Sequence, residues 1–389
     1  MKFSLSAQDL KRALNTCNEI APATSAIADE KTGVLIRAEG ESAIFMSTDE
    51  NLAVRVEVPA VVKEKGEALV KCASVATSAS ATFVDTDAEG TLNDVQVEST
   101  AKETLKLTGK GKFTKHNKNF PLLNVGFFIE TPEFDEEQAT LFPAFQFMDG
   151  LSKVSHAASN DVSKPQFNCI SLTLSDNEIV FAATDGVQIA EFKKAVEVKG
   201  LRGSFILGLK FANLAAKLVN PSLDDLESLQ LYQQEDTFHL KSGGTVLVGS
   251  LINTAFPEYI PYLETKKLTK AVFPREAFLE TLQATQPTVD VKSHRLVIEA
   301  NSATGKADVS TSSVTGDASL TDDGLLEVKT PVDFVLHFDS VLLQNATRQL
   351  KGDQFNFFFT EGAASRGVVL NSDKDNDFKA FVCTLKIIE

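Results

Sequence analysis

Three segments of the chain begin with the same kind of amphipathic helix, and this internal repeat restricts the possible folds more than any other feature. The helices are predicted over residues 8–20, 144–158 and 275–284. Apolar residues recur in them at spacings of three, four and seven, as in Leu10, Leu14 and Cys17, which marks one buried stripe per helix. The simplest organisation is three copies of one unit of roughly 130 residues, a usual size for a domain.

A second helix is predicted in each copy, about 65 residues after the first. These helices cover residues 69–78, 208–219 and 340–350, and Asp339 or Ser340 can cap the last of them. Alternating runs bounded by turn residues predict strands at 34–37, 43–46, 179–182, 245–251, 295–299 and 355–359. The expected fold is α+β, with two helices packed on antiparallel sheets in each of three domains.

One strand and its turn are duplicated between the first two copies. Residues 43–49 parallel residues 178–185, and both runs end in Thr-Asp. Asp49 and Asp185 could form a pair of metal ligands, but each is better explained as the cap of a turn. Residues 119–123 and 255–259 are predicted to close the first and second copies with a strand. The predicted domains are 1–130, 139–263 and 268–389, and the acidic stretch 130–137 suits an exposed linker.

The net charge of −15 argues against nucleic acid, since phosphate binding needs Lys and Arg. The distribution of charge argues the other way, because cations recur on the polar faces of equivalent helices, where acidic residues are few. The alternative explanation is that these are ordinary solvent-exposed helix faces, which commonly carry Lys and Arg. If the copies stand side by side, these cations would touch phosphates without reading bases. The candidate DNA-facing residues are Lys11, Arg12, Lys153, Lys164, Lys210, Lys217, Arg348 and Lys351. Of these, Lys164 lies in the loop after the first helix of the second copy.

No feature of the sequence indicates an enzyme. The phosphate-binding, dinucleotide, zinc-protease and serine-hydrolase motifs are all missing, and the five histidines are scattered. The four cysteines lie far apart and form no CxxC pair, so we expect reduced thiols, no metal and no cofactor. The sequence has no apolar run long enough for a membrane span and no signal-peptide pattern at its start. The expected compartment is the cytoplasm.

Several short motifs, in order along nearly the whole chain, resemble the bacterial beta-type sliding clamp, the processivity subunit of DNA polymerase III. Thr184-Asp185-Gly186 is the most recognisable, although a Thr-Asp-Gly turn alone is common in hairpins. The resemblance implies that two three-domain subunits close head to tail into a ring around duplex DNA, with helices lining the hole. The other motifs are Lys2-Phe3-Ser4, Gly109–Phe113, Lys164–Cys169, Phe256–Tyr259 and His337-Phe338-Asp339.

The resemblance also implies a cleft between the middle and last domains that binds peptide segments of the polymerase, the clamp loader and repair proteins. Three distant segments would converge there, at 184–189, 256–263 and 382–388. An apolar groove that takes the anchors of an extended peptide is a familiar mode of recognition. Carried over by position, the cleft residues are Phe167, Thr184, Gly186, Val187, Gln188, Ile189, Pro257, Tyr262, Val382, Thr384 and Lys386.

The sequence departs from the family pattern beside this cleft. Val187-Gln188 stands where the family has His-Arg, Cys169 replaces a glycine, and the C-terminal run 384–387 is Thr-Leu-Lys-Ile. The partner motif is therefore expected to differ from the usual one, and divergence of this degree would fit a virus-encoded replicase. The alternative function is a non-enzymatic repeat scaffold that does not bind DNA, which the acidic net charge favours.

Overall fold

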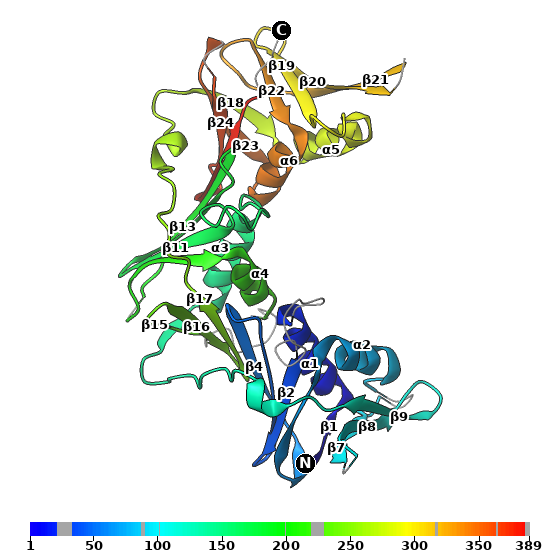
Figure 1. Ribbon diagram of the computed structural model, residues 1–389. Coiled ribbons are helices and arrows are strands. Elements are labelled where there is room, and N and C mark those ends of the chain that lie inside the picture. The colour runs from blue at the N-terminus through cyan, green and yellow to red at the C-terminus, as the bar shows by residue number, and fades with distance from the viewer. Residues whose placement is uncertain are drawn as a thin grey trace. The chain divides into compact units, whose positions relative to one another are not determined.

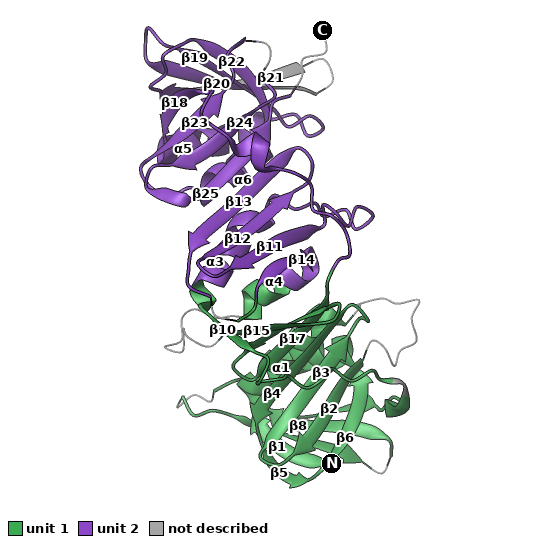
Figure 2. Ribbon diagram, turned by 90° about the vertical axis from the view of Figure 1, so that its left-hand side faces the viewer, with its two compact units in different colours: residues 1–145, 199–201, 214–251 green, residues 146–198, 202–213, 252–389 purple. Residues whose placement is uncertain are grey.

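The computed structural model describes residues 1–21, 33–86, 90–100, 102–198, 200–218, 229–315, 318–362 and 365–385. The chain forms two compact units (Figure 2). Unit 1 comprises residues 1–145, 199–201 and 214–251, and unit 2 comprises residues 146–198, 202–213 and 252–389. No helix within the described ranges is long and apolar enough to cross a membrane.

Unit 1 contains two antiparallel sheets, and helices α1 (Ala7–Ile20) and α2 (Cys72–Thr82) pack side by side within it (Figure 1). The five-stranded sheet has, in spatial order, β5 (Val61–Glu64), β1 (Lys2–Ser6), β7 (Asp94–Thr100), β8 (Thr104–Lys110) and β9 (Lys115–Pro121). The eight-stranded sheet has β10 (Thr140–Phe142), β15 (Leu229–Gln234), β16 (Thr237–Ser242), β17 (Thr245–Ser250), β4 (Leu52–Pro59), β3 (Ser42–Thr48), β2 (Gly33–Glu39) and β6 (Gly66–Lys71).

Unit 2 repeats this plan with helices α5 (Arg275–Thr285) and α6 (Ser340–Gln349), while α3 (Ala144–Ser155) and α4 (Leu209–Leu218) each include residues of both units. Its eight-stranded sheet has β14 (Gly203–Gly208), β11 (Cys169–Ser175), β12 (Glu178–Thr184), β13 (Gln188–Ala195), β25 (Asp375–Cys383), β24 (Gly367–Ser372), β23 (Gln354–Phe359) and β18 (Thr269–Pro274). Its four-stranded sheet has β21 (Ala318–Glu327), β20 (Lys306–Thr315), β19 (Arg295–Asn301) and β22 (Phe334–Asp339). The described residues also include short 3-10 helices, η2 (Val125–Phe127) in unit 1 and η3 (Ile260–Leu263) and η4 (Gln286–Thr288) in unit 2.

All six predicted helices are present, and their ends follow local chemistry. The Ser6 hydroxyl accepts a hydrogen bond from the Asp9 amide and so begins α1, whose buried residues include Leu10, Leu14 and Cys17. The last helix is capped by Asp339, whose carboxylate accepts the amides of Val341 and Leu342. Helix α2 begins at Cys72 and not at 69, because residues 66–71 belong to β6.

The duplicated strand and turn are confirmed as two copies of one hydrogen-bonded structure. Asp49 Oδ1 accepts the amides of residues 51 and 52, and Asp185 Oδ1 accepts those of residues 187 and 188. Thr48 Oγ1 and Thr184 Oγ1 each donate to the carbonyl four residues later and accept the amide two residues later. Both aspartates therefore cap turns, as the sequence predicted.

The strand that follows each of these turns pairs with a strand of the next copy. Strand β4 pairs antiparallel with β17, and β13 pairs antiparallel with β25. The strands of the middle copy are thereby divided between two continuous sheets, which is why the chain separates into two units; the three predicted domain boundaries stay a prediction. Residues 255–259 form no strand, so that expectation was wrong; the middle copy ends its sheet at β17, and Pro257 lacks the amide that a strand ladder needs.

Candidate functional site

A cavity of about 370 Å³ opens in unit 2 where the start of β13 meets the end of β25. Cavities of this size hold small molecules or the anchor side chains of a peptide. Three segments converge on it: the 184–189 turn and strand, the 257–262 connector and the end of β25. Its lining residues are Phe167, Thr184, Gly186, Val187, Gln188, Ile189, Pro257, Glu258, Tyr259, Tyr262, Arg366, Phe381 and Cys383.

The floor of the cavity is apolar. Ile189 and Phe381 are buried in one cluster with Leu263 and Val369. The ring of Tyr262 lies 5.7 Å from that of Phe381, with half of Tyr262 exposed. Burial raises the pKa of the Cys383 thiol, with Asp185 adding to the shift, so the thiol stays protonated and acts as an apolar wall. This floor can take large apolar side chains from a partner.

Gly186 shapes the mouth of the cavity. Its φ of +93° lies in a region that residues with a Cβ rarely adopt, and an added Cβ would stand 3.5 Å from the Phe167 ring. The φ angle therefore favours glycine at this turn, and a side chain here would also cover the end of the Phe167 ring.

Gln188 is a buried polar side chain with one unsatisfied atom. Its amide nitrogen donates to the His156 carbonyl at 3.2 Å and to the Asp185 carboxylate at 2.8 Å. Its Oε1 is buried and has no hydrogen-bond partner within the described structure. A buried acceptor left without a donor costs about 1–3 kcal/mol. Since this oxygen is closed off from solvent, the two hydrogen bonds of the amide nitrogen hold the side chain in place as a wall of the site.

Eight of the eleven predicted cleft residues line this cavity, from Phe167 to Tyr262. Val382 does not: strand alternation turns it to the opposite face, where it is fully buried, while Phe381 and Cys383 face the cavity. Thr384 is also outside the lining and donates its hydroxyl to the Ser365 carbonyl. Lys386 lies outside the described residues.

Sequence reasoning missed five lining residues. Phe381 and Cys383 could have been predicted from strand alternation, since they lie on the opposite face of the same strand from Val382. Glu258 and Tyr259 lie within a segment that was named without them. No sequence pattern predicted Arg366, because only the pairing of β24 with β25 brings this residue to the cavity. The residues missed are Glu258, Tyr259, Arg366, Phe381 and Cys383.

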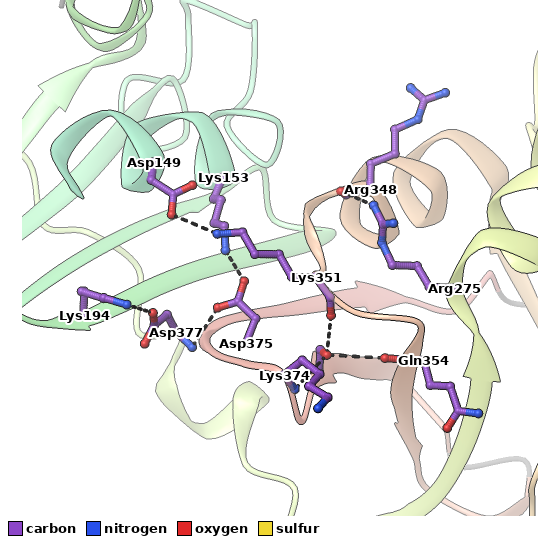
Figure 3. Close-up of polar contacts among 11 residues, drawn as sticks. Asp149, Lys153, Lys194, Arg275, Arg348, Lys351, Gln354, Lys374, Asp375 and Asp377 are labelled. Carbon is purple, nitrogen blue, oxygen red and sulfur yellow. Dashed lines mark hydrogen bonds and ion pairs between the residues drawn. The ribbon is translucent and has the colours of Figure 1, made fainter. Parts of the chain in front are cut away.

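Lys153, expected on a polar helix face, is instead buried in unit 2 (Figure 3). Its ammonium pairs with Asp375, and the two side chains are only 4% and 5% exposed. The nitrogen lies 5.3 Å and 5.5 Å from the ring centroids of Phe192 and Phe378. The β24–β25 hairpin thus covers this side of α3, and the expectation of a surface cation was wrong at this position.

The other candidate cations lie at least partly at the surface, but acidic residues are not scarce beside them. Lys11 lies 2.5 Å from Asp85, and Lys217 lies 3.0 Å from Glu19. Lys351 lies 3.5 Å from Asp149, which Figure 3 shows next to the buried pair. Arg12 and Lys164 each contact an aspartate three residues earlier. Lys210 and Arg348 are exposed. Whether these groups face DNA stays a prediction.

Residues 143–258 match the family model for the DNA polymerase III beta subunit, central domain, a range that lies inside the predicted middle domain. Over most of its length the chain is similar in sequence to bacterial beta sliding clamps, at low identity. The beta sliding clamp of Chlamydia pneumoniae is 23% identical over 299 residues, covering 76% of each chain. That of Micrococcus luteus is 26% identical over 279 residues, covering 70% of this chain and 80% of the relative.

Solved sliding clamps share the whole fold. The clamp from Caulobacter crescentus superposes with a TM-score of 0.83 at 16% identity, with 100% of both chains covered. The beta subunit from Thermotoga maritima gives a TM-score of 0.84 at 15% identity over 99% of both chains. The α+β architecture of repeated clamp domains is thereby confirmed. These relatives are bacterial, and a viral origin of this chain stays a hypothesis.

Proposed function

We propose that this chain is a DNA polymerase processivity factor, a sliding clamp that encircles duplex DNA and holds polymerase and other replication proteins through the cavity of unit 2. The observation that carries the proposal is the cavity itself, in which a Thr-Asp-Gly turn meets an apolar floor. The role fits the family and needs no catalytic group and no cofactor. Its place of action would be the cytoplasm, where the clamp loader and the chromosome meet it.

The peptide-binding role of the cavity rests on its chemistry. An extended segment would bury apolar anchors against Ile189 and Phe381. Because the Gln188 side chain donates hydrogen bonds to the His156 carbonyl and the Asp185 carboxylate, this wall of the cavity is fixed in place before a peptide arrives. Such preorganisation lowers the entropy cost of binding.

The repeated strand pairing supports a head-to-tail dimer. Strands β4 and β13 each pair with the last strand of the next copy, β17 and β25. By chain order, β21 is the counterpart of β4 and β13 in the last copy, and β9 is the counterpart of β17 and β25 in the first. Both β9 and β21 stand at the edge of their sheets. Pairing β21 of one chain with β9 of another would satisfy both edges twice and close a ring.

Charge and apolar exposure favour the same pairing. Six of the 17 residues from 102 to 118 are lysines and one is a glutamate, whereas β21 carries Asp322, Asp323 and Glu327. Phe113, at the tip between β8 and β9, is 87% exposed, and Leu325 on β21 is 64% exposed. An acidic edge would thus meet a basic edge, with an apolar residue on each side.

The oligomer is tested by measuring solution mass for three forms. Wild type should be a dimer. Lys115→Glu with Lys118→Glu should be a monomer at the same concentration. Mixing it with the Asp322→Lys, Asp323→Lys chain should restore dimers, because one interface of the mixed ring is then charge-swapped and the other keeps the wild-type charges. A dimeric Lys115→Glu, Lys118→Glu chain would place the interface elsewhere.

DNA encirclement is tested by retention on circular and linear duplexes. A clamp loaded with its cognate loader should stay on a nicked circle and run off once the circle is cut. A scaffold of the alternative kind would not distinguish the two substrates. Polymerase capture is tested with Val187→Asp, which puts a charge at the mouth of the cavity and should abolish capture by a dimeric ring.

A further inference from the structure

The charged residues that line or adjoin the cavity are few, and their partners separate them into two kinds. The carboxylate of Asp185 is engaged by two amides and by the Gln188 side chain, and that of Glu191, beside the cavity, accepts the Tyr259 hydroxyl at 2.9 Å. Arg366 and Glu258 line the cavity and are exposed. Among the described residues, neither of their side chains makes a hydrogen bond or an ion pair.

Arg366 is the only cation among the described residues that line the cavity. Its position is fixed by the main chain, since its carbonyl accepts the Thr384 amide at 3.1 Å. The residue that follows, Gly367, pairs with Cys383 across the β24–β25 ladder. An anchored backbone and an unengaged guanidinium at the edge of an apolar floor form a recognition element for an anion.

We propose that Arg366 makes this cavity selective for peptide segments that carry an aspartate or glutamate beside their apolar anchors. The inference rests on the proposed role of the cavity as a peptide site and adds the chemistry of the peptide. A guanidinium offers two parallel N–H groups that match a carboxylate, so the contact has direction as well as charge. Glu258 could attract a basic residue in the same way, but an ammonium meets a carboxylate as a hydrated point charge with less geometric selection.

The effect should be modest, because Arg366 is exposed. Ion pairs at exposed sites contribute about 0.2–1 kcal/mol, and tenfold in affinity corresponds to about 1.4 kcal/mol. An acidic residue should therefore strengthen binding about threefold at low salt. The gain should shrink as ionic strength rises towards 1 M, where the Debye length falls to about 3 Å.

The test uses the full-length chain and a set of fluorescein-labelled, amidated hexapeptides. Each contains Leu-Phe as anchors, one Asp, Asn or Lys moved through the other positions, and alanine elsewhere. Dissociation constants are measured by fluorescence anisotropy at 50 mM and 1 M salt for wild type, Arg366→Gln, Arg366→Glu and the matched control Lys292→Gln. Lys292 is an exposed cation of unit 2 outside the cavity lining.

At one or more positions, the Asp peptide should bind wild type and Lys292→Gln about three times more tightly than the Asn peptide. The difference should vanish in Arg366→Gln and turn in favour of Lys in Arg366→Glu. Equal binding of Asp and Asn peptides, a preference for Lys, or no binding of any peptide to wild type overturns the inference. Pull-down of the cognate polymerase, run beside it, decides separately whether the tethering role stands.

Discussion

Replacing Lys153 by methionine tests whether this residue belongs to the protein core or to a DNA-facing surface. Methionine keeps most of the length and apolar character of the lysine stem and removes only the charge. In the variant, Asp375 keeps the Asp377 amide at 3.3 Å but loses its buried ammonium partner. Removing one member of a buried ion pair costs about 3–5 kcal/mol, because the other charge stays buried without compensation.

The structure offers a matched control on the same hairpin. Lys194 pairs with Asp377, but these side chains are 40% and 31% exposed, so Lys194→Met should lose less than about 1 kcal/mol. In urea unfolding followed at one fixed protein concentration, Lys153→Met should lower the midpoint by about 1 M or more and Lys194→Met by a few tenths. Lys153→Met with Asp375→Leu should recover part of the loss, since no charge is then left unpaired.

Two results would refute this reasoning. Equal midpoints for Lys153→Met and Lys194→Met would mean that the buried pair contributes no more than an exposed one. A reduced salt dependence of DNA binding in Lys153→Met would return this residue to the DNA-facing set. We expect that salt dependence to be unchanged.

The remaining predictions concern the hole, the turn and pH. Replacing three exposed helix cations by Glu should weaken retention on circular DNA; the three are Lys210, Lys217 and Arg348. The slope of log affinity for DNA against log salt concentration should fall by about 0.9 for each lost phosphate contact. An unchanged slope would mean that these residues do not touch DNA. Gly186→Ala should weaken peptide binding and lower stability by about 1–2 kcal/mol because of its φ of +93°, whereas Gly40→Ala, in an open hairpin with a φ of +55°, should lower stability without changing peptide affinity. Burial lowers the pKa of His156 to about 4, so its contribution to stability is full above about pH 6.5 and is lost as the pH falls towards 4; a His156→Asn variant should unfold with a shallower pH dependence over that range.

The local elements of this protein were determined by the sequence itself. Helix stripes such as Leu10, Leu14 and Cys17, and caps such as Asp339, depend on residues within a few positions of one another, so their spacing alone specifies them. The paired turns at Asp49 and Asp185 were predictable for the same reason, because each aspartate bonds amides two and three residues on. Most of the cavity was also foreseen, through positions that match the family motifs.

Tertiary structure decided what depends on residues distant in the chain. Lys153 and Asp375 are 222 positions apart, and a lysine on a helix gives no sign that a hairpin will cover it. Arg366 reaches the cavity only because β24 pairs with β25. Which face of β25 is turned to the cavity decides that Phe381 and Cys383 line it and that Val382 does not. The division of the middle copy between two sheets likewise follows from long-range pairing of β4 with β17 and of β13 with β25. Strand pairing and burial are set by the free energy of the whole packed fold, and local sequence patterns do not encode which distant partner lowers it.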